Sequence, residues 1–482
     1  MGQKPGISHM TRKRKLVGSL NRRDILKYGF YGPVAMSLSP VLWLTSCCKV
    51  NGGNKRPNII LISVDTLRPD HLACYGYPKN TSPNIDNFAA ESLVFEKCFS
   101  HAPLTSASLS SLLSGFLPHE TKVTNKSVLS EKVQMLPEIL RPHGYKTAAV
   151  VSNYVLRKNR GWEQGFDVYD AEMKQRELNR NMQEKIAEHA TNGAIKLLKR
   201  FRKKQLFMWI HYQDPHGPYT PPKPFSSLFL SPREKPRNLR MNTTGSGRGG
   251  IPAYQKLGAN KNFNYYVSQY NGEIRYLDKH FGRLIESLKD MGLYNDTFII
   301  FTSDHGEGMG EHNYYFAHGE NLYNIMTHVP LIIRYGTQLA GRRTDNVQHI
   351  DIVPTILNVV NIALSPLFRG CDLRSKTSVN REIFAKMERE IVQDSIKFSV
   401  IYDGLKLIYT PIYKQYELFS LEKDFKEEHN LIDVPEYHLR MEDLKIRLNR
   451  IVKEDFLRLG ELSSPELSNE ELEKLKTLGY VE

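Results

Sequence analysis

The stretch that organises the chain is FIIFTSDHGEGMGEHN, which runs from Phe298 to Asn313. Its first four residues are apolar and predict a strand buried on both faces, and the run ends abruptly in polar residues that include Asp304 and His305. In open α/β sheets, ligands bind at the carboxyl ends of the strands. The segment alone fits a strand with ordinary polar capping residues equally well, so the groups at other strand ends decide between these interpretations.

Two further apolar runs also end in titratable side chains. Residues 58–64 predict a second buried strand that ends on Asp65, and residues 206–210 predict a third that leads into His211. His216 follows in a turn rich in Pro and Gly. A buried, hydrogen-bonded histidine is an equal alternative for His211, whereas the turn favours a functional role for His216.

Thr105 begins a segment in which leucines recur at helical spacing as far as Gly115, a residue typical of helix C-termini. Thr105 is therefore predicted to lie at a helix N-terminus, where free N–H groups and the helix dipole favour an anion. Any helix would also accept a threonine there as a simple N-cap, and the residues alone favour that alternative.

Composition describes a soluble globular chain with room for one large and one small domain, because 482 residues are 40% hydrophobic at a mean hydropathy of −0.44. A multi-span membrane protein is excluded. Half of the net charge of +14 comes from residues 1–46, which hold eight of the 66 basic residues and one of the 52 acidic ones. The remainder is weakly basic and lacks basic-aromatic interleaving, so it fits an anionic substrate or surface better than a nucleic acid.

The N-terminus predicts export and lipid attachment. Residues 21–27, NRRDILK, resemble a twin-arginine export signal, and the apolar stretch that follows is too short for a spanning helix. Residues 44–47, LTSC, resemble a lipobox, which makes Cys47 the expected lipidation site after removal of residues 1–46. We expect residues 47–55 to be a tether that holds a periplasmic or cell-surface domain at a membrane. An uncleaved anchor is the alternative.

The segment that starts RPNIILISVDTLRPDH at Arg56 resembles the N-terminal part of sulfatases, within the alkaline phosphatase superfamily. The resemblance continues through SDHGE at 303–307, HGENLY at 318–323, VPLII at 329–333 and DIVPTIL at 351–357, and it covers nearly all of residues 56–480. It implies an α/β fold with a large, mixed, mostly parallel sheet flanked by helices. The alternation of strands and helices independently supports that class. The expected parts are a catalytic domain over 56–375, a small α+β subdomain over 376–436 and C-terminal helices over 437–482.

The same resemblance implies a divalent cation, with calcium first and manganese, zinc or magnesium left open by an imidazole among the ligands. The predicted metal ligands are Asp65, Thr66, Thr105, Asp304 and His305, with His71 as an alternative to Thr66 in the outer shell. The predicted catalytic residues are Thr105 as nucleophile and His216, His318 and His211 as donors to the anionic ester or its leaving group. Glu307, Glu311 and His312 rank below His318, and the role of His328 stays undecided.

One departure from the family pattern changes the expected chemistry. Sulfatases usually carry Cys or Ser at the nucleophile position, followed by Pro and Arg two and four places on, and this signature directs oxidation to formylglycine. This chain has Thr105, Ala107 and Leu109 there, so formylglycine is not expected. An unmodified threonine also suits hydrolysis of phosphodiesters or phosphonates and head-group transfer. The expected activity is hydrolysis of a sulfuric ester, small or borne on a glycan; a non-catalytic lipoprotein that binds sulfated glycan or anionic lipid is a third reading.

Further elements follow from periodicity and turn residues. The sequence predicts helices over 176–204, 265–291, 439–457 and 469–478, a hairpin over 398–409 with an Asp403-Gly404 turn, and a strand over 416–421. It also predicts a loop-like insertion over 220–262, which is a candidate lid or selectivity element, with an inert loop as an equal alternative. Asp351 is expected to cap a helix.

Overall fold

The computed structural model describes residues 56–457 except 181, 232–234, 338, 377–380 and 390–395. The predicted export signal, the lipidation site Cys47, the tether and the predicted helix over 469–478 lie outside the described residues. None of the described helices is both long and apolar enough to cross a membrane. The described cysteines Cys74, Cys98 and Cys371 are free thiols.

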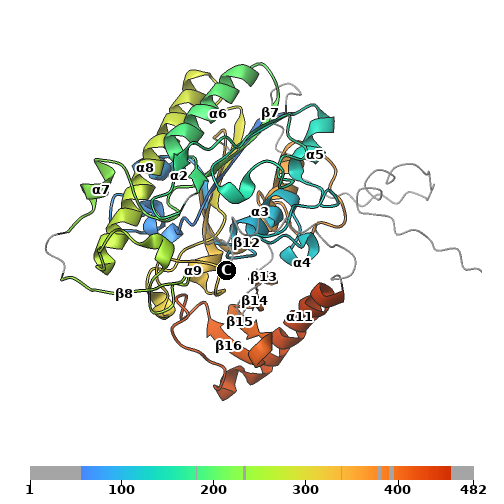
Figure 1. The fold of residues 1–482 in the computed structure, drawn as a ribbon. Helices are drawn as coiled ribbons and strands as arrows, with labels where there is room; N and C mark the ends of the chain where they lie inside the picture. Colours follow the sequence, from blue (N-terminus) through green and yellow to red (C-terminus); the bar gives the residue numbers. More distant parts are fainter. Residues whose placement is uncertain are drawn as a thin grey trace, which may run out of the picture. The chain divides into compact units, whose positions relative to one another are not determined.

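An eight-stranded sheet forms the centre of the catalytic part, in the order β12-β2-β11-β10-β1-β7-β3-β4 (Figure 1). Five neighbouring strands from β10 to β4 are parallel, and β11 runs antiparallel to both of its neighbours. The predicted mixed, mostly parallel sheet is therefore confirmed. Its strands are β1 (Asn58–Val64), β2 (Leu93–Phe99), β3 (Lys146–Val151), β4 (Val168–Asp170), β7 (Leu206–Tyr212), β10 (Thr297–Ser303), β11 (His328–Tyr335) and β12 (Gly341–Gln348).

Helices cover both faces of this sheet, and alternate residues of β1 show it. Ile60 and Ile62 pack into a core shared with α2, α6 and α8, whereas Ile59 and Leu61 pack into a core shared with α3, α5 and α10. A strand buried on both faces needs an unbroken apolar run, which is the pattern that the sequence shows. The helices are α2 (Pro83–Ala90), α3 (Thr105–Ser114), α4 (Pro118–Thr121), α5 (Leu136–Leu140), α6 (Ala187–Phe201), α7 (Phe225–Leu228), α8 (Phe263–Asp290), α9 (Asn324–Thr327) and α10 (Ile352–Val359).

The C-terminal part is a four-stranded antiparallel sheet with one long helix packed against it (Figure 1). Asp403 and Gly404 join β14 to β15 with φ values of 50° and 71°, so the predicted hairpin turn is confirmed. The small α+β part is also as predicted. Its elements are β13 (Ile383–Glu388), β14 (Ile396–Tyr402), β15 (Leu405–Thr410), β16 (Gln415–Ser420) and α11 (His438–Leu457).

Two sequence predictions are wrong in detail. The helix expected from residue 176 begins only at Ala187. Before it, β5 (Gln175–Arg176) pairs antiparallel with β6 (Gln183–Glu184), and Glu177 forms an ion pair with Arg180. Asp351 occupies the N-cap position of α10, as predicted, but its carboxylate makes no hydrogen bond to the first turn of that helix. It accepts instead from Arg381, in a bidentate contact, and from the N–H groups of Gln348 and Cys371.

The insertion over 220–262 is mostly irregular, as expected, with α7 and two short strands, β8 (Arg240–Met241) and β9 (Gly250–Ile251). The ribbon places this insertion beside α8 (Figure 1). Within it, Gly245 and Tyr254 line a small cavity that also contains His216. The insertion therefore contributes to the walls of that cavity.

Candidate active site

Parallel pairing of β10 and β1 brings two of the predicted aspartates to one edge of the sheet. Val64 is paired with Ser303, so the next residues, Asp65 and Asp304, leave the sheet side by side. The Asp304 N–H donates to the Val64 carbonyl at 3.0 Å, which holds this register to the end of both strands. This is the edge where open α/β sheets bind ligands.

Four predicted residues meet at this edge. The Nε2 atom of His305 lies 3.5 Å from Asp304 Oδ2, 4.0 Å from Asp65 Oδ1 and 3.4 Å from the Thr105 hydroxyl oxygen. All four residues are buried. Ligand atoms of Asp65, Asp304 and His305 lie within 4.8 Å of one another, which is close enough to share one metal ion.

The polar atoms of this cluster have an uncommon feature for buried groups. Among the described residues, Asp65 Oδ1, Asp304 Oδ2 and Thr66 Oγ1 have no hydrogen-bond partner. Burial raises the pKa of Asp65 to about 7, and burial together with the neighbouring Asp65 raises that of Asp304. Two buried carboxylates with free oxygens are costly unless a cation neutralises them, so this donor set fits a divalent ion that prefers oxygen and accepts one imidazole.

Thr66 follows Asp65 with a strained backbone conformation. Its φ of 57° is left-handed, a conformation that a β-branched residue rarely adopts. Two contacts hold it: the Thr66 N–H donates to Asp304 Oδ1 at 3.1 Å, and the Tyr270 hydroxyl donates to the Thr66 carbonyl at 2.7 Å. The predicted alternative to Thr66 is His71. Its Nδ1 donates to Asn271 and its ring stacks on Tyr77, so these two contacts orient its ring.

Neighbouring side chains orient the aspartates. Asn153, which follows β3, donates to Asp65 Oδ2 at 2.5 Å, and the Ser108 hydroxyl donates to the Asp304 carbonyl at 2.5 Å. His211 lies within β7, with Nε2 3.6 Å from Asp65 Oδ2 and Nδ1 2.9 Å from the Ser63 hydroxyl. Burial lowers the pKa of His211 to about 4, so the ring is neutral at pH 7. The Nε2 atom of His211 has no hydrogen-bond partner among the described residues, so the ring lies beside Asp65 without a direct hydrogen bond to it.

Thr105 is the first residue of α3, as predicted, and Gly115 ends that helix with a φ of 74°. The helix packs against the sheet through Leu109 and its neighbours, and Leu109 is fully buried. The position that carries Arg in the family pattern is thus part of the core. The N–H of Ser106 donates to Asn125 Oδ1 at 3.2 Å, so Asn125 satisfies a free amide at the helix start.

His216 and His318 line a small cavity of about 20 Å³ next to the cluster, and the cluster residues themselves are not among those that line it. The ring centroids of His216 and His318 are 5.2 Å apart, and the His318 ring is 4.6 Å from that of His305. Burial lowers the pKa of His318 to about 4 and that of His216 well below its ordinary value. Both rings are therefore neutral at pH 7, and each carries one N–H that can donate to an anion.

Glu307 fixes the orientation of His318. Its Oε1 lies 3.2 Å from His318 Nδ1, and its Oε2 accepts from the Tyr219 hydroxyl at 3.2 Å. Burial raises the pKa of Glu307 to about 8, so the carboxyl group is mostly protonated at pH 7. A protonated Glu307 donates to His318 Nδ1, which leaves the proton of His318 on Nε2.

Sequence reasoning missed the cations of this cavity, Arg180 and Arg389, and its neighbours Asn125 and Tyr254. The Arg180 guanidinium forms a bidentate pair with Glu177, donates to the Gly217 carbonyl at 3.0 Å and lies 4.6 Å from the centre of the Tyr254 ring. The sequence predicts a helix at residue 180, and a helix there gives no indication that its side chain contacts the turn of His216. Arg389 comes from the end of β13, far away in sequence, so periodicity gave no signal for it.

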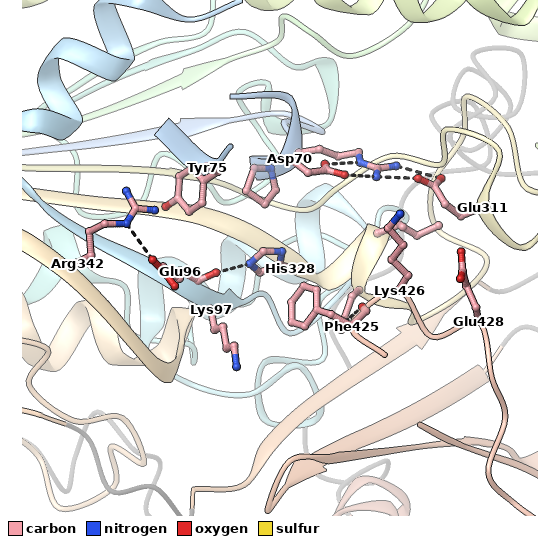
Figure 2. Close-up of a pocket in the computed structure, with 14 residues that line it drawn as sticks. Asp70, Tyr75, Glu96, Lys97, Glu311, His328, Arg342, Phe425, Lys426 and Glu428 are labelled. Carbon is pink, nitrogen blue, oxygen red and sulfur yellow. Dashed lines mark hydrogen bonds and ion pairs between the residues drawn. The ribbon is translucent and has the colours of Figure 1, made fainter. Parts of the chain in front are cut away.

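Another cavity, of about 570 Å³, lies elsewhere, and His328 lines it (Figure 2). Figure 2 shows Asp70 and Glu311 on opposite sides of one guanidinium, which is that of Arg68. His328 Nε2 donates to the Glu96 carbonyl at 2.8 Å in the wall of the same cavity. Glu311 therefore neutralises Arg68. Neither Glu311 nor His328 lines the small cavity of His216 and His318, which we call the catalytic cavity.

Comparison with known families agrees with the geometry. The sequence profile described as Sulfatase matches residues 57–362, which is more than half of the chain. The chain belongs to the sulfatase family. A second profile, described as N-sulphoglucosamine sulphohydrolase, C-terminal, matches residues 310–454. The predicted sulfatase assignment, and with it an ester hydrolase of the sulfuric ester class, is confirmed. Sulfatases generally depend on a divalent metal, and the Asp65 cluster is a candidate site for one.

Individual sulfatases and related structures are similar at low identity. An N-acetylglucosamine-6-O-sulfatase of Bacteroides thetaiotaomicron is 23% identical, over 83% of this chain and 87% of that protein. A structure solved in complex with its substrate, D-glucosamine-2-N,6-O-disulfate, has a TM-score of 0.69 at 20% identity and covers 83% of this chain and 98% of its own. The phosphonate monoester hydrolase of Agrobacterium radiobacter has a TM-score of 0.67 at 19% identity, with coverage of 83% and 96%. At these identities the solved structures show a shared fold.

Proposed function

We propose that this sulfatase hydrolyses a sulfate ester on a sugar, with the unmodified Thr105 hydroxyl as nucleophile. The observation that carries the proposal is the position of Thr105 at the start of α3, 3.4 Å from His305 and next to two aspartates with free oxygens. The relatives that act on sulfated sugars support this substrate class. A buried hydroxyl at a helix N-terminus is well placed to attack an anionic ester that the helix dipole attracts.

A divalent cation, calcium in our proposal, fits the four donors Asp65, Thr66, Asp304 and His305. When bound, it supplies positive charge that favours ionisation of a nearby hydroxyl and stabilises negative charge on the ester oxygens. Asn153 and the Ser108 hydroxyl hold the two aspartate segments in place for it.

The reaction begins when Thr105 Oγ1 attacks the sulfur in line with the bond to the sugar oxygen. A new O–S bond forms as the Thr105 hydroxyl proton passes to solvent, and the sugar O–S bond breaks. The departing sugar oxygen takes the Nε2 proton of His318 while His318 Nδ1 takes the Glu307 proton, so the ring stays neutral and Glu307 is left as a carboxylate. Water then attacks the sulfur of the sulfated threonine; one of its protons returns to the Thr105 oxygen, the other restores Glu307, and sulfate is released. The His318 Nε2–H, set by Glu307, is the donor best supported by hydrogen bonding.

The cavity cations explain how an anion is held without an arginine at position 109. Arg180 and Arg389 both line the cavity with His216 and His318. A guanidinium there attracts the ester oxygens, and the low dielectric of a buried site strengthens that attraction. Arg180 is fixed by Glu177 and Tyr254, so its orientation is set before substrate arrives.

We also propose that the protein works outside the cytoplasm, attached to a membrane by lipid on Cys47. The proposal rests on the order of the twin-arginine-like segment and the lipobox-like residues in the sequence. A surface-anchored sulfatase would meet glycans that do not enter the cell. Labelling of the expressed protein with a radioactive fatty acid, lost in Cys47→Ala, tests this attachment.

A second candidate activity is cleavage of a phosphonate monoester or a phosphodiester, and Thr105 itself favours it. A phosphothreonine is hydrolysed by attack at phosphorus, whereas a sulfated threonine lacks the collapse to an aldehyde that a formylglycine hydrate provides. The shared fold with a phosphonate monoester hydrolase is consistent with this alternative.

The test is a substrate panel on the purified protein. Aryl sulfate, D-glucosamine-2-N,6-O-disulfate, an aryl phosphonate and an aryl phosphodiester are each assayed with calcium, manganese, zinc or magnesium added. We expect release of sulfate to be fastest and to be abolished by Thr105→Ala. Faster cleavage of the phosphorus esters would establish the second activity, and no turnover of any ester would establish a binding protein.

A further inference from the structure

The C-terminal end of α6 carries a dense group of positive charges. Residues 199–204, KRFRKK, contain five basic side chains, and all five are exposed. The chain has no acidic residue between Glu188 and Asp214, so no carboxylate close in sequence balances them. We call these five residues the basic end of α6: Lys199, Arg200, Arg202, Lys203 and Lys204.

The protein itself neutralises little of this charge. Among the described residues, the side chains of Lys199, Lys203 and Lys204 have no ion-pair or hydrogen-bond partner. Arg202 donates to a backbone carbonyl at 3.0 Å, which leaves its charge in place. The helix dipole favours cations in the last turn of a helix, but α6 ends at Phe201, so the dipole does not account for Lys203 and Lys204. The charge is therefore available to a partner outside the protein.

The basic end of α6 lies at the edge of the sheet opposite to the Asp65 cluster. Gln205 joins it to β7, and the Gln205 side chain donates to the Arg56 carbonyl at 2.6 Å while its backbone carbonyl accepts from the Lys146 N–H at 2.8 Å. These residues precede β7, β1 and β3, which are parallel. Asp65 follows the other end of β1, a strand of 7 residues that spans about 20 Å.

Other charges at this edge are also mostly positive. Arg56 Nη1 donates at 3.1 Å to a carbonyl of the exposed turn that begins at Arg141. Asp167 and Asp296 precede β4 and β10 at the same edge, and they are outnumbered by Arg56, Arg141 and Lys146. The five charges of the basic end of α6 therefore add to an edge that is already basic.

The chain also enters the catalytic part at this edge. Arg56 precedes β1 and comes nine positions after Cys47, the proposed lipidation site. Nine residues span at most about 30 Å, so a lipid on Cys47 would keep this edge close to the bilayer. Anionic phospholipids attract clusters of Lys and Arg over roughly 10 Å in salt.

We propose that the basic end of α6 binds the anionic phospholipid surface of the membrane, so that the active site faces away from the bilayer. The inference rests on the proposed lipid attachment and adds an orientation to it, because anchor and basic edge lie together while the Asp65 cluster lies at the opposite edge. A soluble sulfated polysaccharide is also attracted to cations, but the entry of the chain at this edge favours the bilayer.

The test measures vesicle binding without the lipid. The full chain with Cys47→Ala is sedimented with vesicles of phosphatidylcholine alone, or of an equal mixture of phosphatidylcholine and phosphatidylglycerol. We expect binding to the anionic vesicles only, weakened by added salt. Combining Lys199→Gln, Lys203→Gln and Lys204→Gln should lower the affinity for anionic vesicles by about tenfold or more. Residues 1–55 are the same in both proteins, so their own charges do not produce this difference.

The matched control neutralises three exposed lysines of the C-terminal part, with Lys414→Gln, Lys426→Gln and Lys453→Gln. It should keep vesicle affinity within about twofold, because the charge removed is the same but lies away from the basic edge. Both triple variants should keep their melting temperature and their kcat/KM on aryl sulfate, since exposed side chains remote from the active site are changed.

Hydrogen exchange locates the surface that meets the bilayer. Anionic vesicles should slow exchange in peptides that cover 141–146 and 199–205 and leave 411–417 unchanged. Equal vesicle affinity of the two triple variants, or loss of heparin binding in the first without loss of vesicle binding, would overturn the inference. Absence of a fatty-acid label on Cys47 or of sulfatase activity would contradict the proposed function instead, and the vesicle result would stand.

Discussion

Two buried charged clusters in this sulfatase have opposite character. In the C-terminal part, Lys406 lies in β15 and its ammonium is 2.8 Å from Glu427 and 2.9 Å from the Asn324 side-chain oxygen, so the buried charges neutralise each other. At the sheet edge, Asp65 and Asp304 are equally buried, yet each keeps one oxygen without a partner among the described residues. The paired cluster joins two parts of the fold, whereas the unpaired one is organised for a ligand.

The difference teaches how to tell structure from function in one molecule. Burial is the same in both places, so it does not identify the active site. What differs is the charge beside each carboxylate. The Lys406 ammonium lies 2.8 Å from Glu427, whereas the free oxygens of Asp65 and Asp304 lie 4.0 and 3.5 Å from the His305 imidazole. Removing a partner should therefore reduce stability in the first cluster and activity in the second.

The largest effect is expected for the nucleophile. Thr105→Ala should lower kcat/KM by about 10⁴-fold or more, because loss of the attacking oxygen removes the covalent route. The melting temperature should change by only a few degrees, since one small side chain at a helix start is lost. Thr105→Ser is the matched control and should keep measurable activity. Activity of the alanine variant within tenfold of the wild type would contradict the assigned role.

A slightly smaller loss of kcat/KM is expected for substitutions of the predicted metal ligands. Asp304→Asn should lower kcat/KM by about 10³-fold and remove the rise in melting temperature that calcium or manganese causes in the wild type, because one anionic ligand becomes neutral. Removal of one of two crowded carboxylates should leave the metal-free protein as stable as the wild type or more so. A strong loss of stability without metal would place Asp304 with the structural cluster instead.

The paired cluster should respond in the opposite way. Lys406→Met leaves Glu427 buried without its cation and should cost about 3–5 kcal/mol of unfolding free energy. Denaturant titration measures this cost, and the double variant Lys406→Met, Glu427→Gln should recover part of it. The kcat of the folded fraction should stay within about twofold of the wild type. Loss of kcat in a fully folded single variant would show that this cluster also serves catalysis.

Among the substitutions at the active site, the smallest loss of activity is expected at the cavity wall. Arg180→Gln should lower kcat/KM by about 10-fold to 100-fold, because one charged contact to the ester is lost while the nucleophile and the metal ligands remain. Arg180→Lys should be intermediate, since an ammonium lacks the bidentate geometry that Glu177 holds. Steady-state kinetics with and without added guanidinium tests this contact. An unchanged kcat/KM in Arg180→Gln would remove Arg180 from substrate binding.

Much of the fold could be predicted from residues that are close in sequence. Unbroken apolar runs such as residues 58–64 indicate strands buried on both faces, and the Asp403-Gly404 turn specifies a hairpin. The predicted start of a helix at residue 176 was wrong, because the Glu177–Arg180 ion pair and the pairing of β5 with β6 override the local helical preference. That single error also hid Arg180 from the prediction of the site.

By itself, the sequence determined the family, through motifs that resemble those of sulfatases. It also determined the strand ends that bear Asp65 and Asp304 and the start of a helix at Thr105, because these depend on a local pattern of apolar and polar residues. Only the tertiary structure decided which distant groups come together: Arg180, Arg389 and Tyr254 with His216, and Glu320 with Arg389. The physical reason is that these contacts arise from strand order and loop packing, and the spacing of residues along the chain does not record either.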